Sequence, residues 1–526
     1  MGYNIATIII AVGFILFFAI ISAKHDIHMF QLSSYRYSRY LRWLGQGNIW
    51  SRNRAFAMVI VAFSLIPHPF YAALGIAATI TFALVRSKTG KKEAQKTPLV
   101  FTNRVKRLYT TTLLLFAAMV ATTAMLTPAY ATTAVALLIL LSDIVMLGAN
   151  FINTPIEKGI NRGYYNDAKR IIESNKNLII IGVTGSFGKT STKNYLASIL
   201  AEKYNVLVTP GNFNTLLGVI RTIREQLRPY HQVFIVEMGA KQRNDIKEIC
   251  DLVHPTIGIV TAVGEMHLET FKSVENIQDT KFELINSLPA TGLGVINIDS
   301  PYIKSYNKIT SPCKMIKYGT DTTAYYRASE VQYGASGLSF KLTTEQGEEA
   351  YSSRLLGEGN LLNILGAIAV ANHLQVPLQK QKNAIARLQP VEHRLSMRNS
   401  GGITVLDDAY NSNPQGAKMA LNVLRNFAVG EGNKRIIITP GFVEMGTKQA
   451  EANQGLGEEI ARCADYAIVV NQTNREAIKQ GIDKGGMNPD RYFLADSLHQ
   501  AHAHLATILK AGDVVLYEND LPDNFK

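Results

Sequence analysis

The sequence contains few cysteines, three in 526 residues. Cys250, Cys313 and Cys463 are widely separated and match no metal-ligand spacing, so a cysteine-based metal site is not expected. We interpret them as ordinary thiols of a protein in a reducing compartment.

The sequence also lacks clusters of aromatic and basic residues that would stack on nucleic-acid bases, although its net charge is +13. Residues 1–151 hold long apolar runs separated by basic loops, whereas the rest of the chain has an ordinary composition. The basic excess therefore indicates membrane topology, and no nucleic-acid partner is expected.

The apolar runs predict an all-α transmembrane domain over 1–151. They cover 5–23, 55–85, 111–126 and 132–147, and the first lacks the basic n-region of a cleaved signal peptide. The basic loops 24–54 and 86–107 should both be cytoplasmic, which requires 55–85 to turn back at Pro67–Pro69. The prediction is a multi-pass cell-membrane protein with five segments, its N-terminus outside and everything after residue 151 in the cytosol. One long tilted helix over 55–85 is the competing interpretation.

One stretch, 178–200, reads LIIIGVTGSFGKTSTKNYLASIL. It predicts a strand, a glycine-bearing turn and a helix, which is the context of a phosphate-binding loop. Val183 occupies the position of the first glycine in the general pattern, so the loop is a variant. Lys189 can reach terminal phosphates, and the Thr190 hydroxyl can bind Mg²⁺. The predicted ATP-binding loop consists of Gly185, Ser186, Phe187, Gly188, Lys189, Thr190 and Ser191.

Apolar runs alternate with helical patterns after a helical linker at 152–176, and predict a central α/β domain over 177–388 with a mostly parallel sheet. Glu237 ends a buried strand, where a carboxylate can hold Mg²⁺ beside a phosphate loop. His267 and Lys281 follow at the next strand end and helix. Each alone would be an ordinary solvated or hydrogen-bonded group, but their order after the loop favours a site.

Five more strand candidates alternate with helices over 389–526 and predict a small doubly wound, Rossmann-like domain. They cover 403–406, 435–439, 467–470, 492–494 and 514–517. Residues 407–414 follow the first of these strands and alone would be read as an Asx-Pro turn. The predicted fold class is therefore α/β, a P-loop domain plus a Rossmann-like domain, preceded by the transmembrane domain.

Several motifs together resemble the Mur ligases, and most of all the member that adds D-alanyl-D-alanine, over about 160–526. They are GVTGSFGKTST, VEMGA, TAVGEMHLETF with DTKFE, VINID, LQPVEHRL and LDDAYNSNP. The resemblance implies an ATP-dependent amide ligase. In such enzymes ATP phosphorylates a substrate carboxylate, and an amine then attacks the acyl phosphate.

The resemblance also implies residue roles. Thr190 and Glu237 would hold one Mg²⁺ and His267 a second, while Lys281 matches the family's carbamylated lysine that positions the second metal. The catalytic residues would be Lys189, Lys281, His267 and Arg394. Further nucleotide contacts would come from Asn297, Asn360, Asn363, Arg394 and Asp408. The substrate side would include Asn212, Asn214, Thr215, Asn411 and Asn413.

Four features depart from the family pattern. The usual N-terminal UDP-binding domain is missing, and the predicted membrane segments stand in its place. Thr215 and Leu216 occupy positions where the adding enzyme typically has asparagine and an acidic residue, and Gly359 replaces the usual histidine before Asn360. The segment 517–523, YENDLPD, replaces a Lys-Gly-Ser type segment that helps to bind the amino substrate. Most departures fall on the acceptor or amine side, so the reaction type is better defined than the substrate.

The sequence therefore predicts a membrane-anchored, Mg²⁺-dependent ligase that adds D-alanyl-D-alanine or a related amine to a muropeptide cell-wall precursor. Membrane anchoring favours a lipid-linked or membrane-proximal acceptor. Two alternatives stay open, an amide ligase of another envelope polymer and an ATP-binding membrane scaffold or regulator with weakened catalysis.

Overall fold

The computed structural model forms two compact units, 1–162 with 522–524 and 163–521 with 525–526. Each unit is described by itself. The structure describes residues 20–45, 98–126, 137, 141–211, 213–266, 268–334, 336–345, 347–410 and 412–521.

The described part of the first unit is helical. Residues 20–32 form one helix, followed by α2 (Tyr37–Gly45), α5 (Asn103–Leu126) and the first part of α7 (Ser142–Ser174). Apolar side chains from all four helices form its core: Ile27, Phe30, Tyr40, Leu44, Val105, Leu108, Met146 and Ala149. Phe30 packs edge-on against Tyr40 with ring centroids 5.4 Å apart.

The predicted transmembrane domain and the multi-pass membrane localisation are wrong for the part of the chain that the structure describes. No helix in that part is both long enough and apolar enough to cross a membrane. In α5, Arg104, Lys106 and Arg107 occupy the first turns and five threonines interrupt the apolar run, while α7 contains Pro155 and several charged residues. The predicted segment 55–85 lies outside the described residues, as do most of 5–23 and of 132–147.

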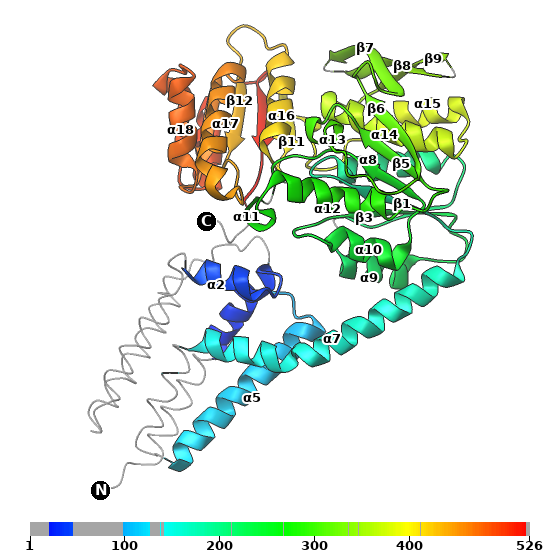
Figure 1. Ribbon diagram of the computed structural model, residues 1–526. Coiled ribbons are helices and arrows are strands. Elements are labelled where there is room, and N and C mark those ends of the chain that lie inside the picture. The colour runs from blue at the N-terminus through cyan, green and yellow to red at the C-terminus, as the bar shows by residue number, and fades with distance from the viewer. Residues whose placement is uncertain are drawn as a thin grey trace. The chain divides into compact units, whose positions relative to one another are not determined.

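The second unit contains a nine-stranded sheet in the order β2-β3-β1-β4-β5-β6-β7-β8-β9. Figure 1 labels β1, β3 and β5 to β9 of this sheet. The first seven pair in parallel, and β7, β8 and β9 add an antiparallel extension that the sequence did not predict. The strands are β1 (Ile179–Thr184), β2 (Val206–Val208), β3 (Val233–Met238), β4 (Ile257–Val260), β5 (Leu293–Asn297), β6 (Lys314–Gly319), β7 (Tyr326–Gly334), β8 (Gly337–Thr344) and β9 (Gly347–Ser353).

Helices cover both faces of this sheet because successive strand residues point to opposite sides. Ile181 and Ile235 pack against α8 and α14, whereas Ile180 and Phe234 pack against α9, α10 and the end of α7. The helices are α8 (Lys189–Leu200), α9 (Leu216–Gln226), α10 (Asp245–Val253), α11 (Leu268–Phe271), α12 (Val274–Asn286), α13 (Pro301–Lys304), α14 (Glu358–His373) and α15 (Leu378–Ala386).

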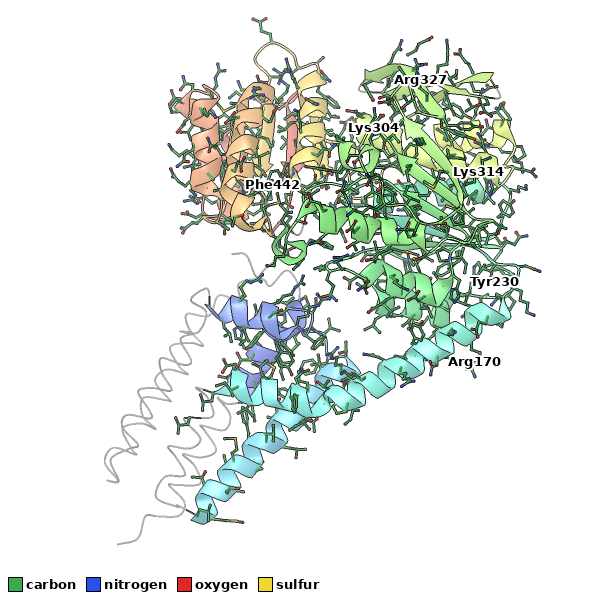
Figure 2. All side chains as sticks on the ribbon, viewed as in Figure 1. Arg170, Tyr230, Lys304, Lys314, Arg327 and Phe442 are labelled. Carbon is green, nitrogen blue, oxygen red and sulfur yellow. The ribbon has the colours of Figure 1, made fainter. Side chains whose placement is uncertain are left out.

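A second sheet follows in the order β10-β11-β15-β12-β13-β14, parallel except for the edge strand β10. Its strands are β10 (Ser396–Ser400), β11 (Ile403–Asp408), β12 (Arg435–Thr439), β13 (Tyr466–Val470), β14 (Tyr492–Ala495) and β15 (Val514–Glu518). Its helices are α16 (Pro414–Asn426), η3 (Gly446–Lys448), α17 (Gln449–Cys463), α18 (Arg475–Lys484), η4 (Pro489–Arg491) and α19 (Leu498–Ile508). Phe442, marked in Figure 2, is buried in its core beside α16 and α17.

Candidate active site

The loop between β1 and α8 has a backbone that requires glycine at two positions. Gly185 and Gly188 have φ angles of +154° and +81°. A Cβ on Gly185 would lie 2.1 Å from the Thr261 hydroxyl oxygen, and one on Gly188 would lie 2.5 Å from Oδ1 of Asn363. The Thr261 hydroxyl donates to the backbone carbonyls of Thr184 and Phe187. These contacts fix the loop against the end of β4 and the start of α14.

Lys189 begins α8 and curls back over the loop. Its Nζ donates to the carbonyls of Gly185 and Ser186, at 2.8 and 3.2 Å. Burial and the nearby Arg394 guanidinium lower the pKa of Lys189 to about 8, while the Glu237 carboxylate acts in the opposite direction. The ammonium group therefore lies where it can meet a polyphosphate on the loop.

Glu237 is the penultimate residue of strand β3 and is 1% exposed. Its Oε1 accepts hydrogen bonds from Thr190 at 3.2 Å and from the Asn214 side-chain amide at 3.0 Å. Its Oε2 lies 3.1 Å from the Lys193 Nζ. Burial alone would raise the pKa of Glu237, but the Lys193 and Lys189 charges and the hydrogen bonds outweigh it and leave the pKa lowered. Glu237 is therefore an ionised carboxylate beside the loop.

Lys281 lies on α12 and is 4% exposed. Burial and the positive charge of Lys189 lower the pKa of Lys281 to about 7, against the opposing effect of Glu283 and Asp245. A large fraction of this side chain is thus a neutral amine at neutral pH, which is the nucleophilic form.

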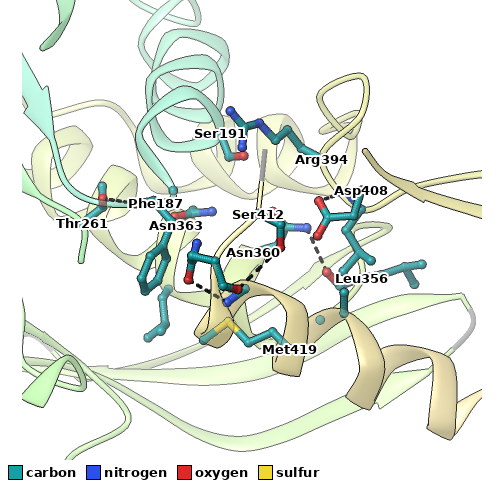
Figure 3. A pocket seen from close by; sticks show the side chains of 18 of the residues that line it. Phe187, Ser191, Thr261, Leu356, Asn360, Asn363, Arg394, Asp408, Ser412 and Met419 are labelled. Atoms are coloured by element: carbon teal, nitrogen blue, oxygen red, sulfur yellow. Dashed lines mark hydrogen bonds between the residues drawn. The ribbon is translucent and has the colours of Figure 1, made fainter. Parts of the chain in front are cut away.

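A pocket joins the loop to the C-terminal domain (Figure 3). Eight residues expected from the sequence to bind nucleotide line it: Phe187, Gly188, Ser191, Asn297, Asn360, Asn363, Arg394 and Asp408. The C-terminal domain also contributes Ser412, Asn413 and Met419. The two domains therefore share this pocket within the second unit.

Two of the asparagines that line the pocket, Asn297 and Asn360, are held by hydrogen bonds. Asn297 donates to the Thr261 carbonyl at 2.8 Å and accepts from the Asp299 backbone at 3.0 Å. Asn360 donates to the Leu356 carbonyl at 2.8 Å and accepts from the Tyr195 hydroxyl at 2.8 Å. These bonds explain why buried amides are present here, and they fix which polar atoms face the pocket.

Arg394 and Asp408 reach the pocket from the C-terminal domain. The Arg394 guanidinium lies 4.1 Å from the centre of the Tyr410 ring, and Asp408 Oδ1 accepts from the Leu395 backbone at 3.0 Å. Burial raises the pKa of Asp408 to about 6, against the opposing charge of Arg394. The guanidinium of Arg394 is the cation that this domain offers to the pocket.

The residues expected on the substrate side are less close together. Asn214 contacts Glu237, while Thr215 caps α9 by accepting from the Gly218 backbone at 3.4 Å. Asn413 caps α16, accepting from the backbones of Gln415 and Gly416 at 3.1 and 3.0 Å. The predicted residues Asn212, Asn411 and His267 lie outside the described residues.

The residues around Thr190 fit a magnesium ion. Within the described part of the chain, no cluster of three or more His, Cys, Asp or Glu side chains could hold a metal. Magnesium, however, usually takes one or two protein oxygens and completes its shell with waters and substrate phosphates. The Thr190 hydroxyl and the ionised Glu237 carboxylate supply two such oxygens beside the phosphate loop.

Two features of the site were not predicted from the sequence. Lys193 follows Lys189 by one helical turn and was not among the predicted site residues, although its Nζ lies 3.1 Å from Oε2 of Glu237. Glu518, at the end of β15, accepts hydrogen bonds from Ser412 of the pocket and from Thr439. Burial raises the pKa of Glu518 to about 8. The available signal was that the segment 517–523, which contains Glu518, departs from the family pattern.

Two family models match this part of the chain. The model of the Mur ligase middle domain matches residues 183–371, and that of the Mur ligase glutamate ligase domain matches residues 393–517. The two matches coincide with the two sheets and include the residues that line the pocket.

Curated relatives from two mycobacteria share one enzyme name. The UDP-N-acetylmuramoyl-tripeptide–D-alanyl-D-alanine ligase of Mycobacterium tuberculosis strain CDC 1551 is 32% identical over 359 residues, covering 64% of this chain and 70% of that protein. The Mycobacterium bovis ligase of that name is also 32% identical, over 57% of this chain and 59% of its own length.

A solved structure shows a similar fold. The MurF ligase of Thermotoga maritima, crystallised in complex with ADP, superposes with a TM-score of 0.60 at 24% identity. The match covers 68% of this chain and 80% of the Thermotoga chain. At this identity the likeness concerns the fold alone.

Proposed function

Because this chain belongs to the Mur ligase family, we propose that it joins an amine, D-alanyl-D-alanine or a close relative, to the peptide carboxylate of a UDP-muramoyl precursor. Members of the family are ATP-dependent acid–amino-acid ligases, and the prediction of such an enzyme is confirmed at the level of the family. The names of the curated relatives support the proposed substrates. The lipid-linked acceptor depended on the membrane domain and is not retained.

The observation that carries the proposal is the convergence of charged groups from both domains on the loop. Lys189, Lys281 and Arg394 lie close enough to influence one another's pKa directly or through a shared neighbour, and Glu237 lies among them. Such a set stabilises the charge that develops on a phosphoryl group in transfer.

The proposed reaction has two steps. The substrate carboxylate attacks the γ-phosphorus of ATP, and the bond to ADP breaks to leave an acyl phosphate. The neutral amine then attacks the acyl carbon, the new C–N bond forms, phosphate leaves, and the amine gives up a proton. Lys189 and Arg394 would neutralise phosphate charge in both steps. No covalent protein intermediate is required.

Magnesium is proposed at Thr190 and Glu237, where it would neutralise phosphate charge. A second ion at His267 and a carbamate on Lys281 remain proposals. The neutral Lys281 amine would attack CO₂, forming the carbamate and releasing a proton. The resulting carboxylate would change the Lys281 side chain from a neutral amine to an anion.

The remaining assignments are also proposals. Residues 177–388 would be the ATP-binding domain and 389–526 the C-terminal ligase domain, after the linker at 152–176. The pocket residues Asn297, Asn360, Asn363 and Asp408 would contact the nucleotide. The residues that would lie toward the acceptor or amine are Asn212, Asn214, Thr215, Asn411 and Asn413.

The experiment that tests the proposed function measures the release of ADP from ATP with and without the acceptor and the amine. A protein that binds ATP without such turnover would instead be the scaffold.

A further inference from the structure

Lys193 is a fully buried lysine with no role in the reaction described above. It lies one turn after Lys189 on α8 and is 1% exposed, as is its ion-pair partner Glu237. Burying an ammonium group is costly unless all its hydrogens are bonded. The groups that contact the Lys193 ammonium therefore indicate its role.

Two of these partners belong to a loop that contacts Glu237 independently. The Lys193 Nζ donates to the carbonyls of Thr209 and Gly211, at 2.8 and 2.9 Å, and lies 3.1 Å from Oε2 of Glu237. Three residues after Gly211, Asn214 donates to the other carboxylate oxygen, Oε1. The loop and the carboxylate are thus joined twice, by Lys193 and by Asn214.

In this arrangement the two carboxylate oxygens of Glu237 have different partners. Oε2 faces Lys193, whereas Oε1 faces Thr190 on the loop side, where magnesium is proposed. Without the ammonium group, Oε2 would lose its charged partner, and only the Thr190 and Asn214 hydrogen bonds to Oε1 would orient the carboxylate. The Thr209 and Gly211 carbonyls would also lose their shared donor. The polar contacts of the Lys193 side chain go to Glu237, Thr209 and Gly211, so we expect its effect to pass through these residues.

We propose that Lys193 is a positioning residue that directs one oxygen of Glu237 toward the Mg²⁺–nucleotide and couples this orientation to Thr209, Gly211 and Asn214. The inference rests on the proposed magnesium position at Thr190 and Glu237. A merely stabilising ion pair predicts a different result, because it would change the unfolding midpoint but leave the magnesium dependence of nucleotide binding unchanged.

The test measures the affinity of the full chain for AMP-PNP, a non-hydrolysable ATP analogue, with and without Mg²⁺. The K193M variant should lose at least about 10-fold of the Mg²⁺-dependent gain in affinity. K203M is the matched control, because Lys203 also donates to two backbone carbonyls, those of Leu374 and Gln375 at 2.9 and 3.0 Å, but far along the chain from Glu237. It should keep the wild-type gain.

Two further variants keep the test decisive. K193Q, which retains a donor but no charge, replaces K193M if the latter does not fold, and the same loss is expected. In an E237Q background, adding K193M should produce no further loss, since the effect passes through Glu237. The proposal would be overturned if K193M and K193Q both kept the wild-type Mg²⁺-dependent gain in AMP-PNP affinity. It would also be overturned if K193M caused its full loss of this gain in the E237Q background. The assay uses neither acceptor nor amine, so failure of the ligase proposal gives a separate result.

Discussion

The hydroxyl of Thr190 donates a hydrogen bond to Oε1 of Glu237 across 3.2 Å, so the first turn of α8 meets the end of β3 at a pair of oxygens. If magnesium binds at this pair, T190A should lower the rate of ADP release by roughly 10- to 100-fold. T190S keeps the hydroxyl and should retain most of the activity. Magnesium titrations of the rate would check this, and equal activity of T190A and the wild type would place the metal elsewhere.

Lys281 provides a chemical test of the proposed carbamate. K281A should lose activity, because neither the amine nor a carbamate is present. Short carboxylic acids such as formate or acetate should restore part of the rate by placing a carboxylate in the vacated space. Rates measured across a series of acid concentrations would check this. K281A that stays inactive at every concentration, while still binding nucleotide, would count against the carbamate.

Lys281 should also impose a pH dependence on stability. Its pKa of about 7 in the folded protein is below its ordinary value of 10.5, so between these values the unfolded chain binds a proton that the folded chain does not. The free energy of unfolding should therefore rise with pH from 7 upward, by up to about 1.4 kcal/mol per pH unit, and fall as the pH drops toward 7. K281M should remove the part of this slope that Lys281 contributes in CO₂-free denaturant titrations, and leave the part from Lys189, whose pKa is lowered to about 8. K317M, at an exposed lysine of β6, is the control and should keep it.

Glu518 should give the free energy of unfolding a pH dependence of the opposite sign. Its pKa of about 8 exceeds the ordinary 4.5, so the folded chain holds a proton that the unfolded chain has lost between these values. Stability should fall as the pH rises from about 4.5 to 8, and E518Q should flatten this decline by up to about 1.4 kcal/mol per pH unit. Denaturant midpoints at pH 5.5 and 7.5 would measure it. E476Q, on exposed Glu476 of α18, should behave like the wild type, and an unchanged slope in E518Q would show that Glu518 is ionised in the fold.

The sequence was sufficient to predict the elements in which local patterns determine structure. The strand-loop-helix at 178–200 follows from an apolar run, glycines and a helical period, and the structure has β1 and α8 there. The five C-terminal strands also occur near their predicted positions. The sequence was sufficient to predict Glu237 at a strand end, because a buried strand has a continuous run of apolar residues.

Other features depend on contacts between distant segments. The burial of Lys193 could not be predicted, since its carbonyl partners at Thr209 and Gly211 lie in an irregular loop. The antiparallel β7–β9 extension and the edge strand β10 carry mixed polar sequences without a clear apolar run. Among the described residues the predicted membrane domain was wrong, because threonines and charged residues interrupt the apolar runs of α5 and α7.

The most direct test of the account is ADP release by the full chain with ATP, Mg²⁺, a UDP-muramoyl tripeptide and D-alanyl-D-alanine. The account predicts ADP release that requires both the acceptor and the amine, together with a product whose mass equals the two substrates minus water. ATP binding without acceptor-dependent ADP release, across UDP-muramoyl peptides and candidate amines, would contradict it.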